Sequence, residues 1–464
     1  MARNIDRISD LPDIIRLQIL CLLPRKFAAR TSALSWRWRD LWRYRRPYET
    51  SLIFDEEFRG ELTPEEFSRT VDQVLKQRGK KKVEIFHIFF YPGTRYQSNT
   101  VSWIEYAISN EVEELYLDFC QGFKQEGTFQ IPNGLLQGDS LTVLNLKYCK
   151  FDQPVGFRRL KFLETVSLKY VDATDDMVLD VISNCPFLER LDLRQCFELR
   201  SIKVSGSNLR LKSLVVVNCW KLDEIEIFAP NLRSFHFNGV FLKSYVFGEI
   251  SLLSDAMMSS LGREPESFQA NWVRIIEDLA HVKVLTLCSR ALEQVAISKQ
   301  STPIPLENLQ ELQLLMGIMT ETSLSDIISF FKKCHCPKLE KVFIELSAGT
   351  KDPALKIFLK APSDEAPIIC DFRSLKIVKM NNFNSYKNEM ELVRFFLEKA
   401  SALESLILVA PQEIRTSVLW SDYRTTMQMN FMKEILANAK VSIYSTSQDL
   451  NGPLPTHYDA YCKF

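Results

Sequence analysis

Residues Leu188–Cys196, which read LERLDLRQC, carry the pattern that decides the fold of this chain. Leu188, Leu191 and Leu193 are separated by two residues and then by one, and Cys196 ends the unit. Side chains two residues apart in a β-strand point to the same face, so Leu191 and Leu193 share one side. The pattern therefore predicts a short strand with one buried face, followed by a turn that holds a small residue.

The same spacing recurs along most of the chain. Ten further copies begin at Val112, Leu141, Leu163, Leu211, Leu232, Val282, Leu309, Leu339, Leu375 and Leu403. The early copies are 21 to 29 residues apart, and the later ones 27 to 36. This period and spacing resemble leucine-rich repeats, which implies an α/β solenoid of parallel strands with helices or irregular segments. A gap of 50 residues after Leu232 predicts a degenerate repeat, or an insertion with a helix near residues 271–279.

The cysteines of the repeats fit a structural role. Cys120, Cys149, Cys196 and Cys219 occupy the position after the strand, where a small apolar side chain fits the turn, so we expect them to be buried wall residues. The chain has 11 cysteines, and charged residues interrupt its N-terminus where a secretory signal would need an apolar run. Reduced thiols in the cytoplasm or nucleus are therefore predicted.

The N-terminal stretch Arg7–Trp42 reads RISDLPDIIRLQILCLLPRKFAARTSALSWRWRDLW. A helix from about Asp13 to Leu23 would be apolar nearly all round, and Pro24 would end it. A second helix is predicted from about Lys26. About 36 residues cannot bury so much apolar surface among themselves, so part of it is predicted to contact another protein.

Several motifs in this stretch resemble the plant F-box. They are Leu11-Pro12-Asp13, Ile19-Leu20, Leu23-Pro24, Arg30-Thr31-Ser32, Leu34-Ser35, Arg37-Trp38-Arg39 and Leu41-Trp42. The resemblance implies a three-helix module over residues 5–48 that docks on a Skp-type adaptor, and through it on cullin and RING subunits. The adaptor contacts that it implies are Leu11, Pro12, Ile15, Ile19, Leu20, Leu23, Pro24, Leu34, Trp38, Leu41 and Trp42. The chain departs from the usual F-box pattern at Ile14, Arg16 and Trp36.

Three further segments are expected after the F-box. Thr63-Pro64-Glu65-Glu66 forms a capping box for a helix that ends near Gly79. A strand and a helix over Val83–Ser109 are predicted to close one end of a solenoid that covers residues 83–365 in about eight to ten irregular repeats. Residues 366–445 resemble the FBD region of plant F-box/leucine-rich-repeat proteins. The matching residues are Ser374-Leu375-Lys376, Asn382-Phe383, Glu391-Leu392-Val393, Phe396-Leu397 and Leu403-Glu404.

The FBD-like region is predicted to fold as strand, helix and strand over about 375–380, 389–400 and 403–408, which would continue or cap the array. After it we expect a helix near 431–439 and a strand over Val441–Tyr444. Gly452-Pro453-Leu454-Pro455 indicates a loose tail.

No catalytic constellation is present in the sequence. A Gly-rich phosphate loop and an H-E-x-x-H motif are absent. The five histidines are far apart in the sequence, which argues against a histidine site. Cys334-His335-Cys336, with Cys370 downstream, lacks the paired C-x-x-C spacing of zinc sites. We therefore expect no enzyme activity, no cofactor and no metal.

The charge balance gives no sign of a nucleic acid or a membrane as partner. The 58 basic residues cancel the 58 acidic residues, and no apolar run reaches membrane-spanning length. Residues 1–50 carry 11 Arg and Lys against five Asp and Glu, which suits an acidic docking partner. Residues 78–82 (RGKKK) fit a nuclear address or, more simply, a solvated turn. The location expected is cytoplasmic, nuclear or both.

The strand positions that alternate with the buried aliphatic residues would form the binding surface of a solenoid. Lys147, Lys169, Arg190 and Arg194 come from three successive repeats and predict a basic strip, followed by the apolar pair Val215 and Val217. Such a surface suits an acidic or phosphorylated target segment, although basic residues on a solvated strand face are common.

The resemblance implies the substrate-recognition subunit of an SCF-type E3 ubiquitin ligase, which binds the adaptor at one end and a target protein at the other. Two alternatives stay open. One is a repeat scaffold or inhibitor that does not direct ubiquitination. The other is a hormone co-receptor, since some plant F-box solenoids bind a hormone and an inositol phosphate.

Overall fold

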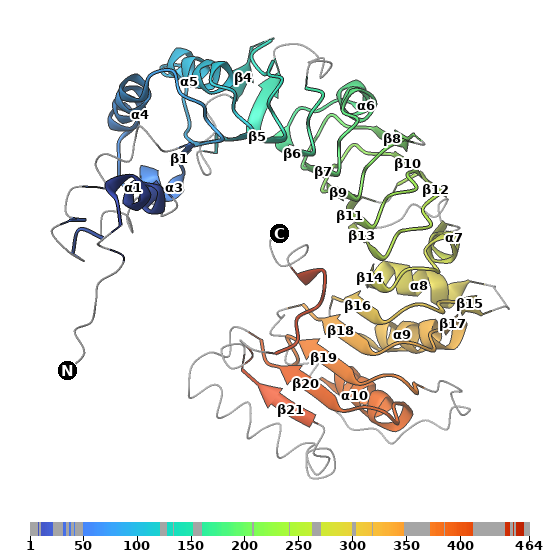
Figure 1. Ribbon diagram of the computed structural model, residues 1–464. Coiled ribbons are helices and arrows are strands. Elements are labelled where there is room, and N and C mark those ends of the chain that lie inside the picture. The colour runs from blue at the N-terminus through green and yellow to red at the C-terminus, as the bar shows by residue number, and fades with distance from the viewer. Residues whose placement is uncertain are drawn as a thin grey trace, which may run out of the picture. The chain divides into compact units, whose positions relative to one another are not determined.

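The chain forms two compact units, residues 1–200 with 208–211 and residues 201–207 with 212–464, and each is described by itself (Figure 1). The computed structural model describes residues 8, 11–21, 31–33, 37–38, 41, 50–120, 128–132, 134–151, 160–206, 208–240, 242–261, 271–298, 303–317, 319–347, 372–384, 386–411, 441–445, 449 and 452–458. The statements below refer to these residues. The helices predicted from Lys26 and over 431–439 lie outside them.

The first unit begins with helices and continues as a parallel sheet. Its helices are α1 (Asp13–Cys21), the 3-10 helix η1 (Thr31–Ala33), α3 (Glu56–Arg59), α4 (Pro64–Arg78), α5 (Gln97–Ser109) and α6 (Asp175–Asn184). Its strands are β1 (Ser51–Phe54), β2 (Ile85–Phe89), β3 (Glu114–Asp118), β4 (Phe129–Ile131), β5 (Val143–Phe151), β6 (Thr165–Val171) and β7 (Arg190–Arg194). Strands β1, β2, β3, β5, β6 and β7 pair in that order, all in parallel, and β4 pairs with the end of β5.

The leucine spacing fixes the register of this sheet. Leu115, Leu144, Val166 and Leu191 are direct partners on successive strands, and all four are essentially inaccessible to water. Each repeat thus buries its aliphatic face against its neighbours, as the sequence pattern predicts.

The start of α4 matches the predicted capping box. Thr63 accepts a hydrogen bond from the N–H of Glu66, and the Glu66 carboxylate accepts one from the N–H of Thr63. The amide of Gly79 ends the helix by donating to the carbonyl of Leu75, with φ of 68°. Arg78 is buried and donates to the carbonyls of Lys81 and Lys82, so the basic run 78–82 forms a tight turn.

The array begins earlier than predicted. The prediction that Val83–Ser109 closes its end is wrong, because β2 pairs on its outer side with β1. The short apolar run Leu52-Ile53-Phe54 is therefore a repeat strand, with Leu52 and Phe54 in the core. Four residues were too few to indicate periodicity.

The second unit holds a longer sheet of the same kind. Its repeat strands pair in parallel in the order β9 (Ser213–Val217), β11 (Ser234–Val240), β13 (Asp255–Leu261), β14 (Val284–Cys288), β16 (Glu311–Leu315), β18 (Lys341–Glu345), β19 (Ile377–Asn381), β20 (Ser405–Val409) and β21 (Val441–Tyr444). Its helices are α7 (Asn271–Asp278), α8 (Ser289–Ile297), α9 (Glu321–Lys333) and α10 (Lys387–Lys399). Helix α8 packs on α7 and α9, and α9 on α10, along one side of the sheet (Figure 1).

The length of a repeat influences whether a second strand or a helix follows its repeat strand. The copies at Leu188 and Leu211 are followed after 23 and 21 residues by the next copy, and the copies at Leu188, Leu211 and Leu232 each contain a second short strand. These are β8 (Ser201–Ser205), β10 (Glu224–Phe228) and β12 (Ser244–Gly248), which form a small parallel sheet. The copies at Leu163, Val282, Leu309 and Leu375, with intervals of 25 to 30 residues, contain helices, whereas the described part of the copy at Val112, with an interval of 29, contains the strand β4. A helix rises about 1.5 Å per residue and a strand about 3.3 Å, so a helix needs about twice as many residues to span the same distance. A short repeat therefore has enough residues for a second strand but not for a helix.

The long gap after Leu232 contains a degenerate repeat. Strand β13 pairs in parallel with β11 and with β14, and its side chains Ala256 and Met258 take the buried aliphatic positions. Helix α7 follows where the sequence predicts it. The FBD-like region also continues the array as predicted, through β19, α10 and β20, and Val441–Tyr444 is the predicted strand.

A left-handed residue directly follows each of the repeat strands β7, β9 and β19, and another lies within each of β5 and β6. Tyr148, Tyr170, Gln195, Asn218 and Asn382 have φ between 53° and 57°. The rings of Tyr148 and Tyr170 stack with centroids 4.3 Å apart, and Gln195 donates to the Tyr170 hydroxyl. Left-handed backbone is costly for residues with a Cβ, so the stacked side chains on neighbouring turns help to hold it.

The C-terminal segment is not a loose tail. Pro455 and His457 are buried, and several of residues 449 and 452–458 contact side chains on β13, β14, β16 and β19. This segment lies on the side of the sheet opposite α8, α9 and α10 (Figure 1). The prediction from Gly452-Pro453-Leu454-Pro455 failed because turn-forming residues indicate the local backbone and carry no information about distant contacts.

Candidate functional site

Helix α1 has a buried side and an exposed apolar side. Leu17 and Leu20 are buried, and Leu20 packs with Trp38 in a small core bordered by Ile19 and Leu41. Ile14 and Ile15 are instead 54% and 39% exposed. Neighbouring apolar side chains left in solvent mark a surface that suits a protein partner.

The predicted adaptor contacts fall into four groups. Pro12 and Ile15 are exposed, and Leu11, Ile19 and Leu41 are half-buried. Leu20 and Trp38 lie in the interior, so they support the surface from beneath instead of forming it. Leu23, Pro24, Leu34 and Trp42 lie outside the described residues.

Arg16 is a charged residue at a position where the F-box pattern usually has an aliphatic one, and its contacts show how the N-terminal module accommodates it. Its guanidinium donates to the carbonyl of Leu11 at 2.9 Å and to that of Arg37 at 2.6 Å, and it pairs with Asp13. The guanidinium also lies 5.8 Å from the centre of the Trp38 ring. The side chain is 7% exposed, so Arg16 joins the start of α1 to the Trp38 segment.

The open strand face of the first unit consists of three rows of side chains at neighbouring register positions. The rows are Ile85, Glu114, Val143, Thr165 and Arg190; His87, Tyr116, Asn145, Ser167 and Asp192; and Phe89, Asp118, Lys147, Lys169 and Arg194. All are partly or fully exposed, so this face is accessible from solvent.

Three of the four residues of the predicted basic strip lie together, and the fourth lies apart from them. Lys147, Lys169 and Arg194 are neighbours in one row, whereas Arg190 lies at the other end of its strand. Lys147 forms an ion pair with Asp118 at 3.0 Å, and Arg194 with Asp192 at 2.7 Å. The face therefore carries basic groups with acidic partners beside them.

The valines predicted to follow the strip belong to the second unit. Val215 is half-buried on β9. Val217 is only 2% exposed, so it is not available as a surface residue.

The C-terminal segment covers much of the strand face of the second unit. Its middle row consists of Val215, His236, Met257, Thr286, Gln313, Phe343, Lys379 and Ile407. From Met257 onward every member of this row is buried, although the corresponding row of the first unit is half-exposed.

Polar contacts fasten this segment. The Lys379 ammonium, with its side chain 1% exposed, pairs with Asp449 and donates to the carbonyl of Pro453 at 3.0 Å. The Thr456 amide donates to the buried carboxylate of Glu311 at 2.7 Å. Sequence reasoning missed these contacts because they join residues at least 70 positions apart.

Two histidines that are distant in the sequence meet at one carboxylate. The Nε2 atoms of His236 and His457 lie 3.2 and 3.3 Å from Oδ1 of Asp255. The imidazole rings pack edge to face with centroids 4.4 Å apart. Nδ1 of His457 shares a hydrogen bond of 2.7 Å with the Thr286 hydroxyl. The expectation that the histidines are scattered is wrong for this pair, and no local signal links His457 to β11 and β13.

The surroundings set the charge of this cluster. Burial alone would raise the pKa of Asp255, but hydrogen bonds from His236, His457 and Ser234 together hold it below its usual range. Burial lowers the pKa of His457 and outweighs the opposing hydrogen bond to Asp255. At neutral pH the cluster therefore presents a carboxylate and a neutral His457 imidazole.

Most of the described cysteines are buried. Cys149, Cys196 and Cys219 are buried as predicted, and Cys120 is half-buried. Burial raises the pKa of Cys149 above its usual range and that of Cys185 to about 12, so these thiols stay protonated. Cys334 is buried beside the exposed His335, and Cys370 lies outside the described residues.

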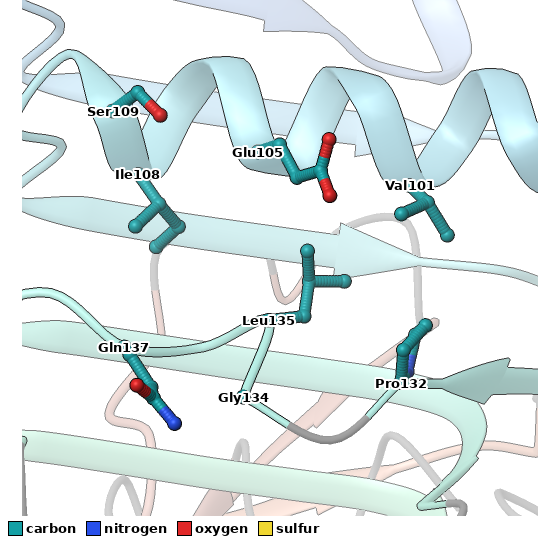
Figure 2. Close-up of a pocket in the computed structure, with 8 residues that line it drawn as sticks. All are labelled: Val101, Glu105, Ile108, Ser109, Pro132, Gly134, Leu135 and Gln137. Carbon is teal, nitrogen blue, oxygen red and sulfur yellow. The ribbon is translucent and has the colours of Figure 1, made fainter.

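A small cavity of about 260 Å³ lies between α5 and the segment after β4. Figure 2 shows its lining residues, Val101, Glu105, Ile108, Ser109, Pro132, Gly134, Leu135 and Gln137. Glu105 is the single ionisable group among them, so the cavity lacks the converging polar groups of a small-molecule site.

A small apolar helical module in front of a solenoid of parallel strands defines an F-box and leucine-rich-repeat protein. The F-box domain model matches residues 8–50. The model of the At1g61320/AtMIF1 leucine-rich-repeat domain matches residues 74–457. The chain belongs to this family, whose model reaches as far as His457.

Similar proteins of Arabidopsis thaliana align with this chain over nearly their whole length. The chain is 25% identical to the putative FBD-associated F-box protein At1g61330, over 94% of this chain and 97% of that protein. It is 24% identical to the FBD-associated F-box protein At1g61320, over 93% and 94% of the two chains. It is also 24% identical to the F-box/FBD/LRR-repeat protein At1g78750, over 92% and 95%. Among the described helices, none has the length and hydropathy needed to cross a bilayer.

Proposed function

We propose that this chain is the substrate-recognition subunit of an SCF-type ubiquitin ligase, with its F-box on a Skp-type adaptor and its repeat array on a target protein. The observation that carries the proposal is the F-box joined to a leucine-rich-repeat array in one chain. The adaptor would connect it to cullin and RING subunits. Such a role belongs to the cytoplasm or nucleus, where the cysteines stay reduced.

Exposed apolar side chains of α1 support the adaptor contact. Pro12, Ile14 and Ile15 form a neighbouring apolar group, while Leu20 and Trp38 hold the helix from within. Covering this group with an adaptor would remove apolar area from water, which favours association by about 25 cal/mol for each Å². Ile14 stands where many F-boxes have an acidic residue, so we expect it to add apolar contact.

The strand face of the first unit is the better candidate for the target. Its three rows are open, whereas the C-terminal segment covers the middle row of the second unit. Lys147, Lys169 and Arg194 lie in one row, with Arg190 on the same face. Arginine and lysine bind carboxylates and phosphates through charge-assisted hydrogen bonds, so an acidic or phosphorylated segment is the expected partner.

The mechanism would be one of placement and requires no catalytic residue in this chain. Holding the adaptor and the target on one polypeptide raises their effective concentration relative to each other. Ubiquitin transfer would then occur on other subunits of the ligase.

The adaptor contact is tested with the Ile15→Asp variant and a purified Skp-type adaptor. A charge placed in the interface should weaken binding at least tenfold. Ile297→Asp, at a 58% exposed position of α8, is the matched control and should bind normally. Failure of the unchanged chain to bind the adaptor at micromolar concentration would contradict the proposal.

The target contact is tested by charge reversal at Lys147, Lys169 and Arg194. Reversal at the exposed Lys76, Lys80 and Lys161 is the control, because it changes the net charge equally away from the strand face. Proximity labelling should lose the same proteins in the first variant and after removal of residues 110–410, and keep them in the control. An unchanged labelling profile would exclude this face.

Target turnover separates a ligase subunit from a repeat scaffold. When residues 5–48 are deleted, the abundance of a captured target should rise if the chain directs ubiquitination. Unchanged abundance, with adaptor binding intact in the full chain, would favour the scaffold.

A further inference from the structure

We propose that His236, Asp255 and His457 form a binding site for a divalent transition-metal ion of the zinc class, which fastens the C-terminal segment to the strand face of the second unit. The three side chains are the single group of this kind found among the described residues. They come from β11, from β13 and from the C-terminal segment, so an ion at this place would join three separate parts of the unit.

The donor set fits this class of ion. Two imidazoles and one carboxylate occur together in many zinc sites, and the ligand atoms are nitrogen and oxygen at about 2.0–2.2 Å from the metal. Each residue offers one ligand atom here, and the three atoms lie within 4.8 Å of one another.

The distances within the cluster support the fit. Ligands of a tetrahedral ion at these bond lengths lie about 3.3–3.5 Å from one another. Asp255 Oδ1 lies 3.2 Å from His236 Nε2 and 3.3 Å from His457 Nε2, so two of the three edges already have this length. The third edge, between the ligand atoms of the two histidines, is no longer than 4.8 Å.

The surroundings supply the outer contacts that metal ligands normally have. Thr286 is fully buried, and its hydroxyl lies 2.7 Å from Nδ1 of His457. With Thr286 as the acceptor for Nδ1–H, Nε2 of His457 is free to coordinate. Ser254 donates to the other oxygen of Asp255 at 3.4 Å, which fixes the carboxylate.

Access and local charge are also suitable. His457 is buried, with its side chain 1% exposed, whereas the side chains of His236 and Asp255 are 17% and 23% exposed and leave an approach from solvent. The buried carboxylate of Glu311 holds the Thr456 amide next to His457 and adds negative charge nearby. A fourth position on the ion would be open to water.

The consequence is a metal-dependent closure of the strand face. Residues 452–458 contact Asp255, Thr286, Glu311 and Lys379 on the strand face, and His457 is the residue that would link them to the ion. Loss of the metal would leave this segment held by the ion pair of Lys379 with Asp449 and by its hydrogen bonds to Lys379, Glu311, Thr286 and Asp255.

The test is a titration of the chelator-treated full chain with Co²⁺ and Zn²⁺, read by calorimetry and by the Co²⁺ absorption spectrum. One ion should bind per chain, with a spectrum of nitrogen and oxygen ligands and no thiolate charge-transfer band. His236→Ala and His457→Ala should each weaken binding at least tenfold. His335→Ala, beside Cys334 and Cys336, is the control and should bind as the unchanged chain does.

Two further measurements keep the proposal open to refutation. Thr286→Val keeps all three ligands and should weaken binding about 10- to 100-fold, because it removes the contact to the imidazole. Zinc should slow hydrogen exchange of residues 452–458 in the unchanged chain and leave it unaltered in folded His457→Gln. No stoichiometric binding, equal binding in the two alanine variants, or loss of binding in His335→Ala would overturn the proposal.

Discussion

Replacing Lys379 by Met should release the C-terminal segment from the second unit. Lys379 is 1% exposed, and its ammonium pairs with Asp449 and donates to the Pro453 carbonyl. Removing one partner of a buried ion pair leaves the other charge unpaired, which costs about 3–5 kcal/mol. Methionine preserves the volume, and its row neighbours Phe343 and Ile407 are apolar, so the strand itself should tolerate the change.

The cost should appear as local opening and not as loss of the whole fold. The C-terminal segment can detach while the rest of the unit stays folded. The variant can therefore lower the free energy of global unfolding by no more than the free energy that docking of the segment contributes. Hydrogen exchange of the amides of residues 452–458 should accelerate at least about 100-fold, since about 1.4 kcal/mol corresponds to a factor of ten.

Two comparison variants make this prediction specific. Lys376→Met removes an exposed ion pair with Glu340, in which both side chains are nearly half exposed, and should cost no more than about 1 kcal/mol. In the double variant Lys379→Met with Asp449→Asn, part of the loss should return, because the unpaired carboxylate is gone. If Lys379→Met exchanged no faster than Lys376→Met, the ion pair would not hold the segment and the reasoning would fail.

Three further effects are expected in the first unit. Thr63→Ala should lower the free energy of unfolding by about 1 kcal/mol in chemical denaturation, through loss of the cap on α4; no change would mean that the Glu66 side chain suffices. Leu191→Ala should cost about 2–5 kcal/mol in the same assay, because it opens a cavity in a repeat core. Arg16→Ala should weaken adaptor binding and lower the melting temperature of the N-terminal module, since the buried guanidinium links Leu11 to Arg37. A variant that melted and bound normally would show that these contacts are dispensable.

The repeats were predictable because they depend on local pattern. The spacing of Leu188, Leu191 and Leu193 determines which side chains are buried, and the parallel register follows from stacking equal units. Even the weak copies at Leu339, Leu375 and Leu403 supply strands. The same rule places Lys147, Lys169 and Arg194 in one row before any contact is known.

The limits of local reasoning lie where a pattern is short or lost. Strand β1 and the repeat of β13 carry too few aliphatic residues to show the period, and the structure identifies both through their parallel partners. On helix α1 the apolar residues surround the axis, so sequence alone could not separate the buried Leu20 from the exposed Ile15. Only packing against Trp38 decides it.

The amino-acid sequence by itself therefore determined the class of protein, the positions of most repeat strands and the absence of known catalytic motifs, because each depends on residues within about 30 positions. The tertiary structure alone decided that the C-terminal segment closes the strand face of the second unit. It also decided that His457 meets Asp255 across 202 positions. Contacts of this kind form when segments that are distant in the sequence pack against each other. Neither a repeat period nor a local propensity predicts which distant residue will make the contact.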